Sequence, residues 1–504
     1  MKKVLFVVLA IILSTTLSEC SFSRPSTIEP PVDEIPDEEV PVIEDPVTGL
    51  EYILYENDLY HEFFSLESTV EIQMHIDPSE LQLIQSDFDH YRSINSKSPI
   101  YRKADITFII NGVSHVYEEV GIRMKGNTSR TSFYNIENGM YDMIHFKLSF
   151  SETFDDTEDY VNPKVWDQAD RSERKNRLFA GMEKLDLKWN RVQDETYSRE
   201  YWVYDMFRSF GVLAPNITPV NLKINYSGQL ENFGVVYALE TVDDLFLEKR
   251  LSTKHLEGDL YKVGWDHQYG GNLTLDTLDR IGIEDENIPY FPVYDLKTNK
   301  KTSDHSHMRN LILKLNNENR PGDVVHLDYY IAFEAVSFLS GNPDDLRNHF
   351  NNYYIYFLKD SGLAIFIPYD YDRTMGINWD WNPTGNAMTS YSPYTKRTTM
   401  GEGNNQINPL VLKTIARDSG MDQLILDYRA LILEIVESKY FDINQFRAVF
   451  DINQAKYGDL TQYAIDALSN KSVSFNFNET INMAVSAYLE RKLETVNNLI
   501  DSYQ

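Results

Sequence analysis

Two short apolar runs joined by a tight turn place the strongest constraint on the fold of this chain. Residues 352–358 (NYYIYFL) and 363–369 (LAIFIPY) are rich in aromatic and β-branched side chains, which is typical of β-strands. The segment between them (KDSG) ends in glycine, which accepts the positive φ of a turn. The sequence therefore predicts an antiparallel hairpin in which the start of the first strand lies beside the end of the second.

Side chains with oxygen ligands precede the first strand of this hairpin and follow its second strand. They are Asp344, Asp345, Asn351 and Asn352 before the first strand, and Asp370 and Asp372 after the second. The hairpin brings the two groups together, and such a cluster suits Mg2+, which takes one or two carboxylates plus phosphate oxygens and water. A spare carboxylate can orient a hydroxyl nucleophile, as in phosphoryl transfer. From spacing alone, turn and cap positions explain these residues equally well, and Asp344 is not separated from Asp345.

Other metal interpretations of the sequence are weaker. Asp370-x-Asp372-x-Thr374 begins like a calcium loop, but Trp381 stands near the position of the closing glutamate. His305 and His307 lie in a polar linker with no third ligand nearby, which is typical of solvent-facing histidines.

A second polar block follows a predicted strand at residues 116–124. The loop 125–130 (KGNTSR) offers backbone and hydroxyl donors to a phosphate, and Arg123 and Lys125 offer charge. It is neither a Walker loop nor a kinase glycine-rich loop. By itself, it fits a hairpin loop with solvated basic residues at least as well.

Taken together, the blocks 120–129 (VGIRMKGNTS) and 341–376 resemble the CotH family of spore-coat kinases. A less specific similarity runs from about residue 65 to the end of the chain. The resemblance implies an α+β, atypical protein-kinase-like fold with two lobes. A mixed α/β N-lobe is expected over about residues 59–250 and a helix-rich C-lobe over about residues 251–504.

The resemblance also implies an activity, the transfer of the γ-phosphate of ATP to Ser or Thr of a protein with Mg2+ or Mn2+. It assigns Asp345 to orienting the acceptor hydroxyl, and Asn352, Asp370 and Asp372 to the metal. The nucleotide-binding candidates are Arg123, Lys125, Asn127, Ser129, Lys147 and Glu240. Lys147 equally fits a solvated strand residue, since it shares a strand face with His145 and Ser149, and Glu240 equally fits a cap of the following helix.

The remaining pattern predicts supporting elements. Strands are expected at 69–76, 104–110, 145–150, 219–224 and 233–240, and helices from 78 and at 197–211, 328–339, 410–416, 421–437, 443–450 and 482–501. Residues 152–177 are expected to be an irregular insertion and 270–302 a loop or lid. Lys262 is a candidate cleft residue. Arg199 or Glu200 can brace a phosphate-binding lysine, although a surface ion pair explains them more simply.

The net charge of the chain limits the classes of partner that it can bind. A formal net charge of −30 argues against nucleic acid, whose phosphates would be repelled, and makes a basic protein the first substrate to try. The 42% of hydrophobic residues suffices for a large core. A non-catalytic surface protein that uses the same fold for adhesion or scaffold assembly is the alternative, because fold does not fix function.

The first 58 residues predict export and tethering. Residues 1–20 read as a lipoprotein-type signal, with Lys2 and Lys3 before an apolar run and the single cysteine, Cys20, at the site of cleavage and acylation. Residues 21–58 form an acidic, Pro-rich linker, and folded structure is expected from near Tyr60. The sequence thus predicts a secreted, membrane-anchored lipoprotein on the extracellular or envelope side.

Replacing the predicted acylation site tests this anchor. In Cys20→Ser the thiol that would carry the lipid is absent, so the protein should move from the membrane fraction to the soluble fraction. Fractionation and immunoblotting of cells producing either form measures this. Unchanged membrane association of the variant would show that Cys20 is not the anchor.

Overall fold

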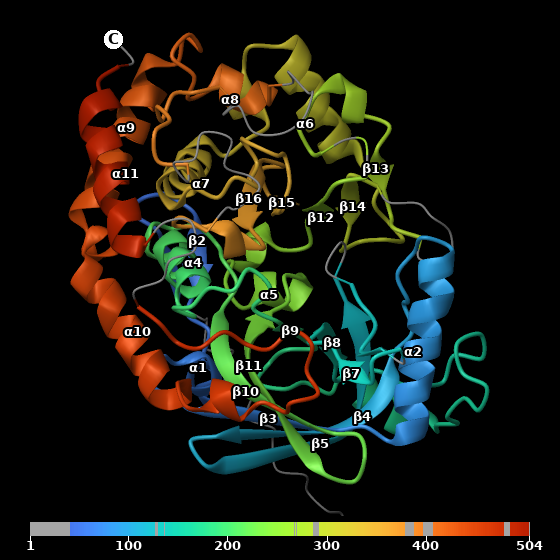
Figure 1. Ribbon diagram of the computed structural model, residues 1–504. Helices are drawn as coiled ribbons and strands as arrows, with labels where there is room; N and C mark the ends of the chain where they lie inside the picture. The colour runs from blue at the N-terminus through green and yellow to red at the C-terminus, as the bar shows by residue number, and fades with distance from the viewer. Residues whose placement is uncertain are drawn as a thin grey trace, which may run out of the picture. The chain divides into compact units, whose positions relative to one another are not determined.

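A closed seven-stranded β-barrel forms the first half of the fold (Figure 1). The computed structural model describes residues 41–126, 130–135, 137–266, 268, 270–285, 292–377, 388–396, 407–477 and 484–502. The barrel strands are β3 (Val70–His75), β4 (Arg102–Ile110), β5 (Val113–Lys125), β8 (His145–Ser149), β9 (Lys184–Lys188), β10 (Ile217–Asn225) and β11 (Leu230–Glu240). Their order around the barrel is β10-β11-β9-β8-β5-β4-β3, and the parallel pair β10–β3 closes it.

Alternation along these strands fills the barrel with apolar side chains. Every second residue of a strand points to the same face, so one set of side chains lines the interior and the other faces outward. Within the barrel, Phe108 stacks on Phe179 with 3.8 Å between ring centroids. The turn between β4 and β5 has positive φ at Asn111 and Gly112, as an Asn-Gly hairpin requires.

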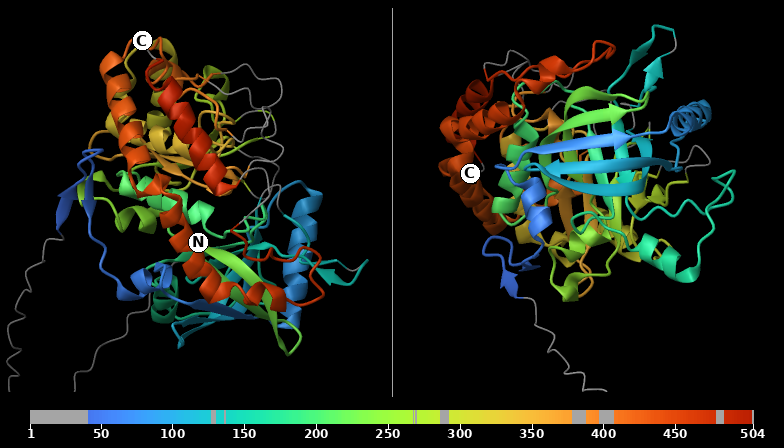
Figure 2. Two further views of the ribbon diagram at one scale, coloured as in Figure 1. Left: turned by 60° about the vertical axis from the view of Figure 1, so that its left-hand side comes forward. Right: turned by 90° about the horizontal axis from the view of Figure 1, so that it is seen from below.

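Helix α2 (Pro78–Ser93) stands beside the barrel and contacts β4 and β5, and Figure 2 shows it from below. It begins at Pro78 as predicted, and the Asp77 carboxylate caps it by accepting the Ser79 N–H. Shorter elements surround the barrel: α1 (Asp58–Phe64), β6 (Tyr134–Asn135), β7 (Met140–Tyr141) and α3 (Gln168–Lys175). The insertion 152–177 is therefore irregular except for α3.

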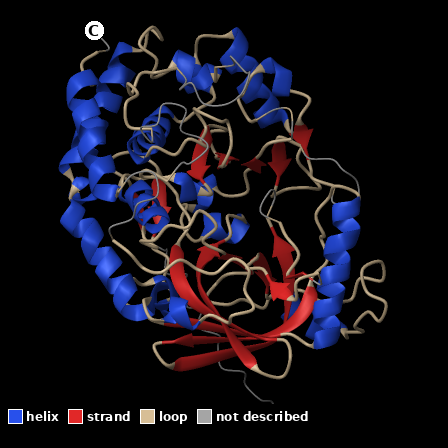
Figure 3. Cartoon of the chain, viewed as in Figure 1, coloured by secondary structure: helices blue, strands red, loops and turns tan. Residues whose placement is uncertain are grey.

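A five-stranded sheet, ordered β13-β14-β12-β15-β16, carries the predicted hairpin (Figure 3). Its strands are β13 (Ile281–Gly282), β14 (Tyr294–Leu296), β12 (Leu260–Val263), β15 (Tyr353–Phe357) and β16 (Ala364–Pro368). Leu358 and Leu363 close the turn by a backbone hydrogen bond of 3.0 Å, and Gly362 has a φ of +69°. The hairpin is confirmed. The region 270–302 is more than a loop, because β14 lies inside the sheet.

Helices cover this sheet and continue the chain. Helix α7 (Leu327–Ser340) packs against β16, α4 (Arg199–Ser209) and α9 (Asp422–Glu437), and its residues from Tyr329 to Ser340 are all buried. The other helices are α5 (Asp244–Glu248), α6 (Ser306–Asn317), α8 (Pro409–Lys413), α10 (Ile443–Tyr457) and α11 (Val485–Leu499). None of the helices in the described ranges is long and apolar enough to cross a membrane.

The mixture of sheets and helices agrees with the predicted α+β class, while the two-lobed arrangement stays a prediction. Folded structure begins earlier than expected, because β1 (Val42–Glu44) pairs with β2 (Glu51–Ile53) and Tyr52 bridges to Leu251. Three predicted functional residues, Cys20, Asn127 and Ser129, lie outside the described residues.

Candidate active site

The candidate site is built on the outer, polar face of strands β8 and β9. Phe146, Leu148, Leu185 and Leu187 point into the barrel core, so His145, Lys147, Asp186 and Lys188 take the opposite face. This outer face is not solvated. Asp186 is 2% exposed and Lys188 8%, and α4 and the exit of the β15–β16 hairpin lie against Lys188. Charged groups are rarely buried unless they are paired, so their partners define the site.

Lys188 joins three parts of the chain through one ammonium group. Its Nζ lies 2.9 and 3.0 Å from the two carboxylate oxygens of Glu200 on α4. It also lies 2.5 Å from Asp370 and 3.3 Å from Asp372, both just after β16. A barrel strand, a helix and the hairpin exit therefore converge on this lysine.

These contacts set the protonation of the group. Burial alone would lower the pKa of Lys188, but the carboxylates of Asp370, Asp372 and Glu200 raise it well above its usual range, so the ammonium stays charged. The Asp370 side chain is 40% exposed. Partial burial acts to raise the pKa of Asp370, but Lys188 overrides it and lowers the pKa to about 2. Burial raises the pKa of Asp372 to about 7, against the attraction of Lys188 and with the repulsion of Asp370.

Asp186 holds two further lysines beside this network. It pairs with Lys125 from the end of β5 and with Lys147 on β8, the latter at 2.9 Å. Burial alone would raise the pKa of Asp186, but the two ammonium groups lower it below its usual range. Lys147 also donates to the Thr241 hydroxyl at 3.1 Å, and burial lowers its pKa to about 8 despite Asp186. With its side chain 13% exposed, Lys147 is thus a largely enclosed residue of this face and not a solvated one.

The hairpin brings the backbone of its entry and its exit together as the sequence predicts. The carbonyl of Asn352 accepts the N–H of Tyr369 at 3.1 Å, so Asn352 lies beside the residue that precedes Asp370. The Asn352 amide in turn donates to the Asp344 carboxylate at 2.9 Å. Asp344 also contacts His349 at 3.0 Å, and its side chain is 16% exposed.

Asp345 occupies a different environment. It is 3% exposed, and its carboxylate accepts the backbone N–H of Asn348 at 2.7 Å. Burial raises the pKa of Asp345 to about 8, and the nearby Glu334 carboxylate adds to the shift. Of the adjacent aspartates, Asp344 is the one in contact with Asn352.

Backbone strain concentrates around these residues. Phe350, Asn352, Asp370 and Met375 all adopt positive φ, between 49° and 59°, which non-glycine residues rarely do. Strained positions of this kind gather at functional sites, where the surrounding structure holds them in place. Gly341 ends α7 at a φ of +68°, and a Cβ there would lie 2.2 Å from the Tyr488 hydroxyl, so glycine is required.

The first turn of α4 is held by buried contacts of Arg199 and Glu200, so the expectation of a surface ion pair is wrong. Arg199 and Glu200 are 1% and 3% exposed. Arg199 pairs with Asp194 at 2.5 Å and donates to the carbonyl of Met375 at 3.2 Å. The first turn of α4 is thereby fixed to the segment that follows Asp372, and Glu200 braces Lys188.

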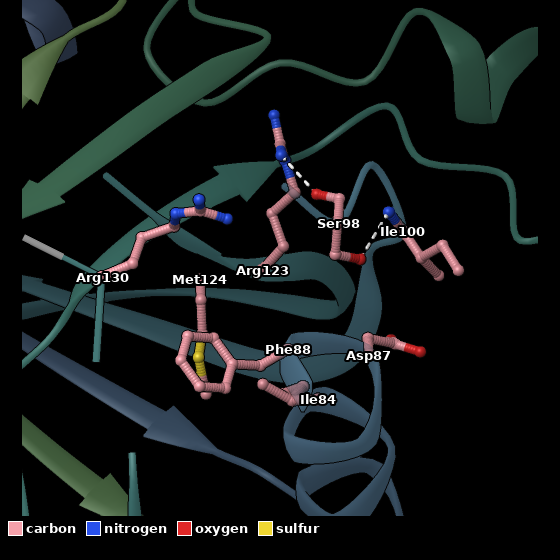
Figure 4. Close-up of a pocket in the computed structure, with 8 residues that line it drawn as sticks. All are labelled: Ile84, Asp87, Phe88, Ser98, Ile100, Arg123, Met124 and Arg130. Carbon is pink, nitrogen blue, oxygen red and sulfur yellow. Dashed lines mark hydrogen bonds between the residues drawn. The ribbon is translucent and has the colours of Figure 1, made fainter. Parts of the chain in front are cut away.

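Two predicted nucleotide-binding residues, Arg123 and Glu240, make hydrogen bonds or ion pairs with groups other than Lys188 and Asp186. Arg123 donates to the carbonyl of Ser98 at 2.6 Å and lines a pocket with Arg130 over the apolar Phe88 and Met124 (Figure 4).

Glu240 is 1% exposed and pairs with Arg250 at 2.5 Å and Lys249 at 3.4 Å, which holds the end of β11. The expected capping of α5 by Glu240 is wrong, because the Asp243 carboxylate accepts the Phe246 N–H.

The donor set near Asp370 can supply only part of the ligand shell of a divalent cation. Within the described residues, no three His, Cys, Asp or Glu side chains are grouped to hold a metal by themselves. Asp370 and Asp372 share a single ammonium group, and Asn352 lies beside Tyr369. Mg2+ commonly takes only one or two carboxylates, with phosphate and water completing its shell.

Comparison with known proteins identifies the family of this chain. A family model described as "CotH kinase protein" matches residues 122–492, which contain both polar blocks. The chain belongs to the CotH family. The inner spore coat protein H of Bacillus subtilis (strain 168) is 26% identical over 207 residues, which cover 40% of this chain and 52% of the relative. This CotH-family chain thus spans about half the length of that relative.

Sequence reasoning missed the central lysine of this CotH-family site. Residues 184–188 (KLDLK) alternate charged and apolar side chains, which places Lys184, Asp186 and Lys188 on one strand face. That alternation is the signal that could have found Asp186 and Lys188. Their burial was not foreseeable, because it depends on α4 and on a hairpin more than 160 residues away, as the 182-residue separation of Lys188 and Asp370 illustrates.

The Asp186 ion pairs predict a pH-dependent stability. Asp186→Asn leaves Lys125 and Lys147 without their shared carboxylate and should cost about 3 kcal/mol of unfolding free energy near neutral pH. Since the pKa of Asp186 is lower in the folded state, this stabilisation is complete above about pH 4, the usual range of Asp, and is lost as the pH falls through the folded value.

Urea unfolding of both proteins measures the difference. The gap between wild type and Asp186→Asn should be large at about pH 7 and should narrow towards about pH 3. A gap that stays constant with pH would mean that the Asp186 charge does not stabilise the fold.

Proposed function

We propose that this CotH-family protein is an ATP-dependent kinase that transfers the γ-phosphate to a Ser or Thr hydroxyl of a protein. The Lys188–Glu200 pair carries the proposal, because it combines a strand lysine with a helix glutamate beside an aspartate. Protein kinases use the same combination: a strand lysine, a helix glutamate and a metal-binding aspartate must all be in place for phosphoryl transfer.

The site offers separate surroundings for the cation and for the phosphates. Asp370 and Asp372, with Asn352, would hold Mg2+ or Mn2+, which supplies positive charge to the phosphate oxygens when bound. Lys125 and Lys147 come from the barrel strands β5 and β8, and the Tyr369 ring lies 5.4 Å from the Lys125 ammonium. Lysine ammonium groups there can bind phosphate oxygens and neutralise charge that develops during transfer.

For the residue that orients the acceptor hydroxyl, we propose Asp344 in place of Asp345. Such a group must reach a substrate, and Asp344 is the more exposed of the two and is in contact with Asn352. Asp345 is buried and is occupied by the backbone N–H of Asn348. Its role in this proposal is to shape the loop that presents Asp344.

The partners and location follow from the sequence and the relative. The relative is named an inner spore coat protein, which supports a place in a coat or envelope for this chain as well. The predicted signal and lipid attachment at Cys20 agree with a surface location, and the net charge of −30 favours a basic Ser- or Thr-containing substrate. A scaffold that uses the fold without catalysis is the alternative.

Matched substitutions of the two adjacent aspartates separate these assignments. Asp344→Asn keeps the shape of the side chain but removes the charge that steers the acceptor proton, so turnover should fall about a hundredfold or more while ATP binding survives. Asp345→Asn should change turnover far less, because that buried carboxylate accepts the backbone N–H of Asn348 and an amide oxygen can accept the same bond.

Transfer of labelled phosphate from ATP to a basic Ser-rich protein measures turnover, and calorimetry measures ATP binding. The reverse ranking of the two variants would return the role to Asp345. Wild-type protein that binds ATP without transferring phosphate under either metal would favour the scaffold.

Removing the main carboxylate of the metal site tests the cofactor. Asp370→Asn should lose most of the Mg2+-dependent part of ATP affinity, because a neutral amide is a poor ligand for a hard cation. Asp418→Asn, at an exposed surface aspartate with 64% side-chain exposure, is the matched control. Calorimetric titration of ATP with Mg2+ and with a chelator gives both affinities. Equal Mg2+-dependent binding by Asp370→Asn and wild type would remove Asp370 from the metal site.

A further inference from the structure

Lys262, on β12 of the five-stranded sheet, lies beside the residues that lead into the site. Its ammonium lies 4.0 Å from the centroid of the Tyr369 ring and 5.9 Å from that of Tyr354. Tyr369 is also the ring approached by Lys125, and it directly precedes Asp370. The two lysines, one from each sheet, thus share one aromatic side chain at the edge of the proposed cation site.

The surroundings of Lys262 differ from those of the neighbouring lysines. Lys97 pairs with Glu284 at 2.7 Å, and Lys297 pairs with Asp295. Asp295 is the β14 residue in register with Lys262, but its carboxylate is taken by Lys297. Among the residues that the structure describes, no carboxylate lies within ion-pair distance of the Lys262 ammonium, and the strand residues on both sides of it, Tyr261 and Val263, are buried.

This position is costly for a cation in the absence of an anion. Burial lowers the pKa of Lys262 well below its usual range, and Lys125, Lys297 and Lys97 add to the shift. An aromatic face compensates only part of such a cost. A bound anion would supply the missing charge and remove the mutual repulsion of the lysines.

We propose that Lys262 binds the polyphosphate chain of the nucleotide, between β12 and the Lys125 end of β5. The inference rests on the proposed kinase function, and it adds a phosphate-binding residue from the sheet that carries Asp370. Polyphosphate fits better than a carboxylate substrate, because several cations (Lys125, Lys147 and Lys262) converge from two sheets and two of them share the single carboxylate of Asp186. A chain of phosphates presents oxygens to all of them at once.

Lys262→Met tests the assignment with three probes: ATP, inorganic tripolyphosphate and adenosine, each titrated in the presence of Mg2+. The affinity for ATP and for tripolyphosphate should fall by about tenfold or more, the usual effect of losing a charge-assisted contact. The affinity for adenosine should stay unchanged, since adenosine has no phosphate. Lys262→Arg keeps the charge and should retain most ATP binding. Lys254→Met, at a lysine that is 46% exposed, is the matched control.

Thermal stability separates an anion-binding role from a structural one. Removing an ammonium that has no carboxylate partner in the described structure should leave the Tm unchanged or raise it. A Tm several degrees lower, with equal losses for adenosine and ATP, would show a structural role and overturn the proposal. Undiminished binding of ATP and tripolyphosphate by Lys262→Met would overturn it directly.

The tripolyphosphate arm distinguishes this inference from the kinase proposal. If wild-type protein binds tripolyphosphate but not ATP, and Lys262→Met loses that binding, the phosphate site is supported and the proposal that the protein binds a nucleotide is overturned. Wild-type protein that binds neither compound would overturn both.

Discussion

The ammonium of Lys188 holds the site together because three carboxylates share it. Glu200 comes from a helix, and Asp370 and Asp372 come from the exit of a hairpin, so a single charge joins elements from the barrel and from the second sheet. Three buried or half-buried carboxylates this close repel one another, and without the lysine the arrangement would not be stable. A cation at Asp370 and Asp372 would relieve the same repulsion, and Lys188 would then be available to a phosphate oxygen.

A second buried pair fixes the loop that precedes the hairpin. Arg347 contacts Glu334 on α7 with its Nε at 2.5 Å, and it donates to the Tyr428 hydroxyl on α9 at 3.0 Å. Glu334 is 0% exposed and Arg347 4%, so neither charge has water as an alternative partner. This pair connects the loop carrying Asp344 to the most buried helix of the fold. Strained positions such as Asn352 can persist only on a support of this kind.

Local patterns predicted the elements well, and long-range contacts explain the errors. The β15–β16 hairpin was predicted from residues close together in sequence, and the Asn111-Gly112 turn and the Asp77 cap depend on equally local residues. Solvation was predicted poorly.

Lys147 and Glu200 are residue types common on surfaces, yet the Lys147 side chain is only 13% exposed and Glu200 is buried, because the outer face of the barrel strands and α4 pack against segments distant in sequence. Spacing also left Asp344 and Asp345 unresolved, since which of two adjacent side chains is exposed depends on the conformation of the whole loop.

The placement of charge bears on whether this fold catalyses or only assembles. A scaffold that attracts basic partners needs carboxylates on its surface, where they cost little. Here Asp186, Glu200 and Glu240 are at most 3% exposed and are paired with lysine or arginine. Burying charge in this way costs stability unless it is offset, and replacing such pairs by apolar residues often stabilises a protein. The cationic side of the site, with Lys125 and Lys262 at one tyrosine ring, adds further repulsion. A ligand that carries both a divalent cation and several phosphates offsets both kinds of repulsion at once, which a protein partner on the outer surface would not do.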